Sequence, residues 1–400
     1  MVSGSAKPAL ATLSSVLVAL LLLPACTAEE RIACFLIGSV QNSICPLPGF
    51  FAEDPLFTYE SDPHQAGLSL EERTKLDRLY FPRTRQRLLE KYDMVFFADP
   101  YIEHFTPRQF SDLHYAFTRD GMPSYWSFGP AYGRVIQGSV LNDVLPISEY
   151  EGYYHRPWRP VFRPGRDPVF LPFVSLGMEN IPGEAYAAMK PRQGTEIWAD
   201  MRPLDLPWIV SWQAGGKEGG LAWVYADEFN VYWWGLTSST RGQNPYALDM
   251  MTNMILYSLD QPLLTDIQAR REARYRLSTY RTEKALVLSM LDWADMFGAN
   301  IFALSQELTD LDARAAEALD QYLRREYQGC ISNTEEISAG LTRISSDASR
   351  LKDQALFWVY LSEWLAVSSV SMITGVLLWT LMVRRRMYRT VKATRISRAR

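Results

Sequence analysis

The sequence predicts an α/β domain with a mostly parallel sheet and flanking helices, followed by an α-helical stalk and one C-terminal transmembrane helix. Short apolar runs alternate with helical patterns in the first half, helix-forming residues dominate after Pro262, and residues 364–383 are 20 positions without a charge. Alternating strands and helices favour parallel strands covered by helices. Twenty apolar residues are long enough to cross the hydrocarbon of a membrane as a helix.

The first 133 residues supply the strand and helix alternation. Apolar runs ended by turn residues predict strands, and spaced apolar residues predict helices. Thr106 predicts an N-cap, Pro107 suits the first helical position, and Gly121 ends that helix. The expected order is a strand at 31–40, a helix at 68–92 interrupted at Pro82, a strand at 93–98, a helix at 106–119, and a strand leading into a glycine-rich turn at 122–133.

The rest of the chain divides by composition. Residues 143–203 are rich in proline and are expected to be irregular, whereas 207–226 predicts two strands joined by the glycine-rich loop 214–220. A helix is expected at 245–259. The predicted divisions are a signal segment at 1–28, an extracytoplasmic α/β domain at 29–260, a helical stalk at 261–356, a transmembrane helix at 357–383 and a basic tail at 384–400.

The N-terminal segment has the layout of a secretory signal. Lys7 precedes an apolar stretch that ends in small residues. Leu23-Pro24-Ala25-Cys26 is also similar to a bacterial lipobox, in which Cys26 would be lipidated after cleavage. Ordinary cleavage near Ala28 and an uncleaved signal anchor are the alternatives, and all three send the following chain across the membrane.

The charge distribution orients the chain and limits its partners. The net charge of the chain is −4. Residues 384–400 hold eight Lys or Arg and no acid, so the other 383 residues have a net charge of −12. Positive charge stays cytoplasmic, which predicts a single-pass protein of the cell membrane with its body outside and its C-terminus inside. The bilayer is therefore an expected partner. An acidic body excludes nucleic-acid binding by bulk charge.

The four cysteines do not point to a metal site. If Cys26 is removed or lipidated, Cys34, Cys45 and Cys330 remain, which is an odd number. Cys34 and Cys45 either form a disulfide or stay as separate buried thiols, and Cys330 is then left over or pairs between chains. No cysteine or histidine pair has zinc-ligand spacing, and no cofactor or metal is expected.

Several segments between about residues 31 and 260 resemble class I glutamine amidotransferase-like proteins, in particular membrane-associated members with a flavodoxin-like sheet. The resemblance implies a flavodoxin-like sheet for this chain. The segments that carry it are Arg78-Leu79-Tyr80-Phe81-Pro82-Arg83, Tyr92-Asp93-Met94-Val95-Phe96-Phe97, Ser127-Phe128-Gly129, Val144-Leu145-Pro146-Ile147, Pro207-Trp208-Ile209-Val210-Ser211-Trp212-Gln213 and Gly219-Gly220-Leu221-Ala222-Trp223-Val224-Tyr225-Ala226-Asp227.

The catalytic pattern of that family is missing. The family needs a nucleophilic Cys on a sharp turn after a strand, and a His and a Glu two residues apart after the last strand. Here the turn-like segment carries Ser127, and the segment after Asp227 contains no His. Glutamine hydrolysis is therefore not expected. The candidate pocket residues are Asp99, Trp126, Ser127, His155 and Asp227.

Three functional hypotheses remain. The first is a catalytically inactive amidotransferase-like domain that serves as a binding or assembly module for an unidentified protein or small molecule. The second is an extracytoplasmic hydrolase that uses Ser127 with a base such as His155 in the aromatic stretch 153–158, or a metal near Asp99. The third is a structural subunit whose stalk holds a homo-oligomer. The hydrolase hypothesis requires Ser127 or Asp99 to lie beside an imidazole.

Overall fold

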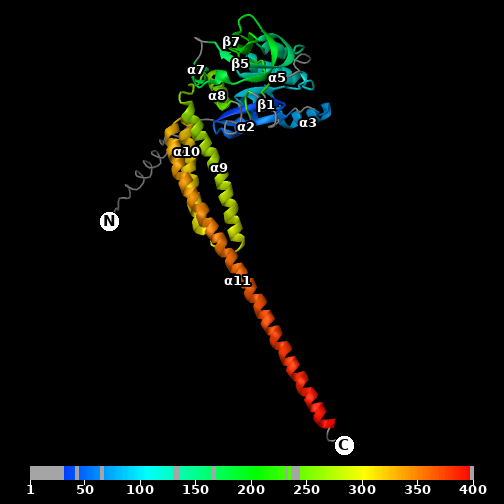
Figure 1. Ribbon diagram of the computed structural model, residues 1–400. Helices are drawn as coiled ribbons and strands as arrows, with labels where there is room; N and C mark the ends of the chain where they lie inside the picture. The colour runs from blue at the N-terminus through cyan, green and yellow to red at the C-terminus, as the bar shows by residue number, and fades with distance from the viewer. Residues whose placement is uncertain are drawn as a thin grey trace, which may run out of the picture. The chain divides into compact units, whose positions relative to one another are not determined.

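The computed structural model describes residues 31–40, 45–63, 67–128, 136–163, 168–229, 233–235 and 244–396, the last seven by their backbone alone. The expected signal segment 1–28 with Cys26 lies outside the described residues, as does the end of the tail, 397–400. The chain forms two units (Figure 1). The α/β unit runs to Tyr275 and includes Leu319–Gln328, and the helical unit contains Arg276–Ala318 and Gly329–Arg400.

Within the described residues, the α/β unit contains one mixed sheet of nine strands in the order β2-β1-β3-β4-β9-β8-β7-β5-β6. The α/β class is therefore confirmed. The strands are β1 (Ile32–Gly38), β2 (Phe57–Pro63), β3 (Met94–Ala98), β4 (Ser124–Ser127), β5 (Ile147–Phe162), β6 (Gly183–Pro191), β7 (Glu196–Arg202), β8 (Leu206–Gln213) and β9 (Leu221–Tyr225).

The sheet is parallel in one half only, which corrects the expectation of a mostly parallel sheet. The neighbours β2, β1, β3, β4 and β9 all pair parallel. Strands β9, β8, β7, β5 and β6 pair antiparallel. The predicted hairpin at 207–226 is confirmed as β8 and β9, and it joins the two halves because β9 pairs with both β4 and β8.

Helices cover both faces of the parallel half. Phe96 and Tyr125 stack on one face, where the Tyr125 hydroxyl donates to the Met254 carbonyl of α8. Phe97 and Trp126 stack on the other, against α5. The described helical segments of this unit are α2 (Leu47–Glu53), α3 (Leu70–Tyr80), α4 (Arg85–Lys91), α5 (Pro107–Thr118), η1 (Val140–Val144), α7 (Leu171–Ser175), η2 (Met178–Asn180) and α8 (Ala247–Ser258).

The predicted start of α5 is confirmed. The Thr106 side chain accepts a hydrogen bond from the Gln109 backbone, the Gln109 side chain returns to the Thr106 backbone, and Pro107 opens the helix. Such a capping box satisfies two backbone donors that a helix leaves unpaired. The expected interruption at Pro82 is confirmed as well, because α3 ends at Tyr80 and α4 begins at Arg85.

The expectation of irregular structure at 143–203 is wrong, because β5, β6 and β7 lie there. Strand β5 pairs with β6 as far as Trp158 and with β7 from Arg159 onward. Its register shifts between His155 and Trp158. Proline has no backbone donor and is tolerated where a ladder is interrupted, so Pro157 and Pro160 fit the place where the strand changes partner.

A fully buried ionic cluster joins the start of α9 to α2 and α8 inside the α/β unit. Arg270 donates to Asp54 and Asp249, and the Tyr322 hydroxyl donates to Asp54 at 3.0 Å. Arg274 donates to both oxygens of Asp249, at 2.7 and 3.0 Å. The two arginine charges hold the pKa of Asp249 below its usual value despite burial. Buried charges are tolerated when they are paired and hydrogen-bonded in this way.

The helical unit is built from α9 (Ile267–Met296), α10 (Phe302–Leu323) and α11 (Tyr327–Ile396), apart from their ends in the α/β unit. Arg343 of α11 pairs with Glu307 of α10 at 2.6 Å. A Cβ on Gly340 would lie 2.9 Å from the Leu311 side chain, which shows how closely α10 and α11 pack.

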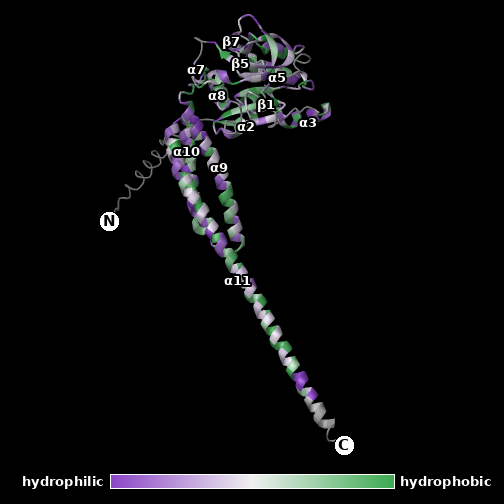
Figure 2. Cartoon of the chain, viewed as in Figure 1, coloured by the Kyte–Doolittle hydropathy of each residue, from purple (hydrophilic) through white to green (hydrophobic). Residues whose placement is uncertain are grey.

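Helix α11 contains the candidate membrane span. Its part from Tyr327 to Arg389 includes an 18-residue stretch of mean hydropathy 1.8, none of which is buried. Figure 2 shows the distal half of α11 in white and green up to a purple segment near the end of the chain. By length and composition this helix can cross a membrane.

Candidate functional site

Two of the residues predicted for the site, Asp99 and Asp227, follow the parallel strands β3 and β9, which lie on either side of β4, at the same edge of the sheet. Strand β3 lies beside β4 with Ala98 opposite Ser127, and β4 lies beside β9 with Ser127 opposite Tyr225. The Asp99 backbone donates to the Ser127 carbonyl at 2.9 Å. This is the carboxyl edge of the parallel half, where open α/β sheets bind ligands.

Ser127 and Trp126 support that edge from within the core. Both are fully buried. The Ser127 hydroxyl accepts a hydrogen bond from the Phe229 backbone at 2.9 Å. Trp126 stacks on Phe97 with ring centroids 3.7 Å apart, and its indole donates to Ser124. A ligand at the surface does not reach either side chain, so neither predicted pocket residue lines an exposed pocket.

No imidazole among the described histidines is a hydrogen-bond partner of Ser127. His155 lies on the exposed side of β5, edge-on to Tyr153 at 5.1 Å. His104 Nε2 lies 2.8 Å from an Asp77 carboxylate oxygen. His114 lines a surface pocket of about 630 Å³ beside α5. His64 lies outside the described residues. The approach of Ser127 to an imidazole, one of the two arrangements that the hydrolase hypothesis allows, is therefore not found in the described part of the chain.

Asp227 is held in a buried aromatic enclosure. The indole of Trp208 donates to Asp227 Oδ1 at 2.6 Å, and that of Trp234 donates to Oδ2 at 3.0 Å. Burial raises the pKa of the Asp227 carboxyl to about 7, although both hydrogen bonds lower it. Removing a charge from water costs more than two neutral donors return. Asp227 therefore gains or loses its proton near neutral pH.

Glu228 is a site residue that the sequence analysis did not select. Its carboxyl is partly exposed, and burial followed by the nearby charge of Asp99 raises its pKa to about 7. A hydrogen bond with Tyr153 opposes that rise. The signal in the sequence was a second acid beside Asp227, shortly after the buried strand β9. Only the order of the strands, with β4 between β3 and β9, brings Asp99 toward it.

Tyrosines from β5 cover the same edge. Tyr150 donates to the Phe128 carbonyl at the end of β4, and Tyr153 reaches Glu228. The Ala187 backbone of β6 donates to the Ala226 carbonyl at 2.6 Å, which fixes the β5–β6 ribbon at the end of β9. Within the aromatic stretch 153–158 it is therefore Tyr153, and not His155, that contacts a carboxyl group of this edge.

The described residues offer no metal centre: they contain no group of three or more His, Cys, Asp or Glu placed to hold an ion. Cys34, Cys45 and Cys330 are free and buried, so the structure has Cys34 and Cys45 as separate thiols instead of a disulfide. Burial raises the pKa of the Cys45 thiol to about 12, which leaves it protonated and unreactive.

The carboxyl edge therefore combines two carboxyl groups, Asp99 and Glu228, that are accessible in part, a buried carboxyl at Asp227, and phenols from the ribbon. Carboxylates and phenols bind cations and hydrogen-bond donors. They provide no activated nucleophile. No model of a known protein family matches this chain, and no curated protein matches it either.

Proposed function

We propose that this protein is a membrane-anchored binding module, and that its α/β unit binds an organic cation at the carboxyl edge beside Asp99 and Glu228. The observation that carries the proposal is the pairing of these two acids. Burial and then the charge of Asp99 raise the pKa of Glu228, so the two carboxylates repel each other at this edge. A bound cation relieves that repulsion, and Tyr153 adds a hydrogen bond that holds Glu228 in place.

The resemblance to amidotransferase-like proteins with a flavodoxin-like sheet supports a binding role. The parallel strands follow the order β2-β1-β3-β4-β9, the same pattern as the flavodoxin order 2-1-3-4-5. In that pattern the fold binds ligands at the carboxyl edge. In this interpretation buried Ser127 takes the place of the family's nucleophile, and the segment after the late strand, which begins Asp227-Glu228, contains no His. These features support the proposal of an inactive, amidotransferase-like domain.

The hydrolase alternative based on Ser127 is not favoured. Ser127 is fully buried and accepts a backbone hydrogen bond. A serine nucleophile needs both access and a base within hydrogen-bond distance. A protein partner and a homo-oligomer remain compatible with a binding module, since a cation recognised at this edge is equally a lysine or arginine side chain.

The proposed location is the cell membrane, with a single pass, the body outside and the C-terminus in the cytoplasm. Arg384, Arg385 and Arg386 follow the apolar stretch of α11 directly. Positive residues next to a span remain on the cytoplasmic side. The expected signal at 1–28 agrees with this direction. A cation site outside the cell would meet its ligand in the external medium.

Binding of a cation tests the proposal. Full-length protein in detergent is heated with millimolar methylguanidinium or with methylurea, its neutral isostere, at pH 6 and pH 8. We expect methylguanidinium to raise the unfolding temperature more at pH 8, because Glu228 is ionised above its pKa of about 7. Methylurea should have little effect.

Two variants complete the test. Glu228→Gln should remove the stabilisation by methylguanidinium, since the amide carries no charge. Glu184→Gln is the matched control, because Glu184 is an exposed carboxylate on the covering ribbon. Equal shifts with the cation and its neutral isostere in the unaltered protein would refute the cation site.

A further inference from the structure

The turn between α9 and α10 presents large apolar side chains to solvent. Met296, the last residue of α9, is 80% exposed, and Phe302, the first residue of α10, is 74% exposed. The turn has a defined local structure. Gly298 adopts a positive φ, and the Phe302 backbone donates a hydrogen bond to the Asn300 side chain at 3.1 Å. A soluble helical hairpin gains nothing by fixing such side chains in water.

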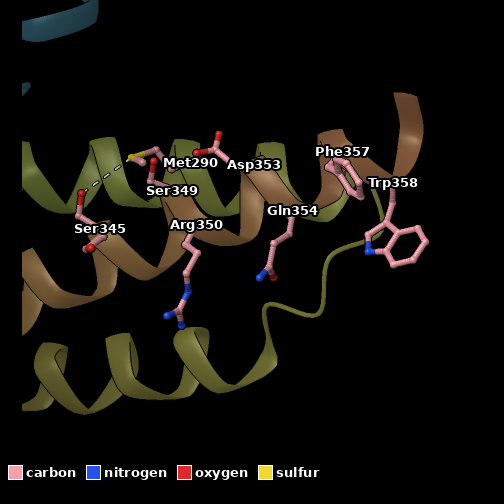
Figure 3. A pocket seen from close by; sticks show the side chains of 9 residues that line it. Met290, Ser345, Ser349, Arg350, Asp353, Gln354, Phe357 and Trp358 are labelled. Carbon is pink, nitrogen blue, oxygen red and sulfur yellow. Dashed lines mark hydrogen bonds between the residues drawn. The ribbon is translucent and has the colours of Figure 1, made fainter. Parts of the chain in front are cut away.

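Contacts within the helical unit show which part of α11 lies beside this turn. The Lys352 ammonium lies 5.6 Å from the centroid of the Trp293 ring. Met290 of α9 shares a surface groove with Gln354, Phe357 and Trp358 of α11. Figure 3 shows this groove with α11 running past α9, and the Phe357 and Trp358 side chains at its far end. Because Met296 is three residues beyond Trp293, the turn ends close to the level of Phe357.

Phe357 is the first residue of the part of α11 whose length matches the thickness of a bilayer. From Phe357 to Val383 the helix carries one charged residue, Glu363, and at 1.5 Å per residue these 27 positions span about 40 Å. That length equals a bilayer with its headgroups. Phe357, Trp358, Tyr360 and Trp364 are all more than 60% exposed on this helix. Aromatic rings of this kind mark the boundary between membrane and water.

We infer that the α9–α10 turn is a second membrane contact: Met296 and Phe302 insert into the headgroup layer of the outer leaflet, beside Phe357 and Trp358. The inference rests on the proposed span, because α11 sets the level of the bilayer. The partner is the lipid surface itself, since the exposed apolar side chains of the turn continue the exposed aromatic band of the span. Asp292 and Asp295 lie next to the turn, so the attraction is apolar and not a charge attraction to anionic lipid.

Depth-dependent quenching tests this contact. Single cysteines replace Phe302, Leu286 or Met372 in the full chain, and each is labelled with an environment-sensitive fluorophore. The described native thiols Cys34, Cys45 and Cys330 are buried, and the chain without an added cysteine is the blank for labelling elsewhere, Cys26 included. The variants are reconstituted in phosphatidylcholine vesicles that contain lipid spin-labelled either at the headgroup or deep in the acyl chain.

The matched positions separate the possible results. Leu286 is 62% exposed on α9, ten residues before Met296 and so about 15 Å further from the turn. We expect headgroup spin labels to quench the fluorophore at position 302 several times more strongly than at 286, and deep labels to quench that at 372. Equal, weak quenching at 302 and 286 with strong quenching at 372 would overturn the second contact alone. Absence of quenching at 372 would overturn the span and, with it, the contact.

Discussion

The Trp208 indole nitrogen lies 2.6 Å from Asp227 Oδ1, and both side chains are buried. This hydrogen bond joins β8 to the second residue after β9, the strand next to the one that ends at Ser127. It places a carboxyl group with a pKa of about 7 under the carboxyl edge of the sheet. The stability and the pH response of the site therefore depend on the same pair.

Replacing Trp208 by Phe should destabilise the α/β unit by about 2 kcal/mol, because it removes a hydrogen bond to an ionisable group. The pKa of Asp227 should also rise, since that bond lowers it. Urea unfolding followed by tryptophan fluorescence measures the first effect. Trp212→Phe is the control: its partly buried indole donates to the neutral Val144 carbonyl, and a smaller loss of about 1 kcal/mol is expected. Equal losses would contradict the role of the Asp227 charge.

Stability should fall as the pH rises from about 4 to 7. A carboxyl whose pKa is raised in the folded chain binds its proton more tightly there, so its contribution is complete below the unfolded pKa and is lost as the pH passes the folded value of about 7. Asp227→Asn should reduce this pH-dependent loss of unfolding free energy by on the order of 2–4 kcal/mol. Urea unfolding between pH 5 and pH 8 measures it, and Glu228 accounts for the dependence that remains. An unchanged slope would show that Asp227 is ionised throughout.

Asp249→Asn should lower the free energy of unfolding by about 3–5 kcal/mol, because it leaves Arg270 and Arg274 buried with too little negative charge. Both arginines donate to this carboxylate inside the protein. The comparison variant is Glu149→Gln, which breaks the solvent-exposed ion pair with Lys190 and should cost less than about 1 kcal/mol. Thermal unfolding of both full-length variants decides the matter, and a mild effect of Asp249→Asn would mean that the cluster relaxes or admits water.

Gly38→Ala should be more destabilising than Gly67→Ala by roughly 1–3 kcal/mol. Both glycines have positive φ, +122° and +99°, so the backbone strain is similar. A Cβ on Gly38 would lie 2.1 Å from the Ala98 carbonyl oxygen, whereas one on Gly67 would meet nothing within 4 Å. The comparison isolates the close approach of β1 and β3 next to Asp99. Chemical unfolding of the two variants gives the difference, and similar losses would show that the β1 end can shift.

Local signals in the sequence were sufficient to predict the elements whose ends are marked by capping, proline or glycine residues. Thr106 and Pro107 predicted the start of α5, and the glycine-rich loop 214–220 predicted the β8–β9 hairpin. The strands of residues 143–203 were missed because β5 carries prolines and changes partner midway, which removes a simple alternation. Strand β2 was missed for a related reason, since its burial pattern shows exposed residues in mid-strand.

The candidate site was only half predictable. Asp99 and Asp227 could be selected because they follow apolar strands, but Ser127, Trp126 and His155 could not be sorted into buried and exposed positions without the sheet. Glu228 has a pKa raised first by burial and then by the charge of Asp99, which lies 129 positions earlier in the sequence. No local pattern encodes a charge repulsion between residues so far apart.

The sequence by itself determined the α/β class, most of the strong helices and strands, and the apolar C-terminal helix, because these depend on patterns within about 20 neighbouring residues. The tertiary structure alone decided that half of the sheet is antiparallel, that Ser127 is buried under Phe229, and that Tyr150 and Tyr153 cover the carboxyl edge. It also placed Lys352 of α11 beside Trp293 of α9, three residues before the end of that helix. Burial, strand partners and pKa shifts arise from groups that meet only when the chain has folded.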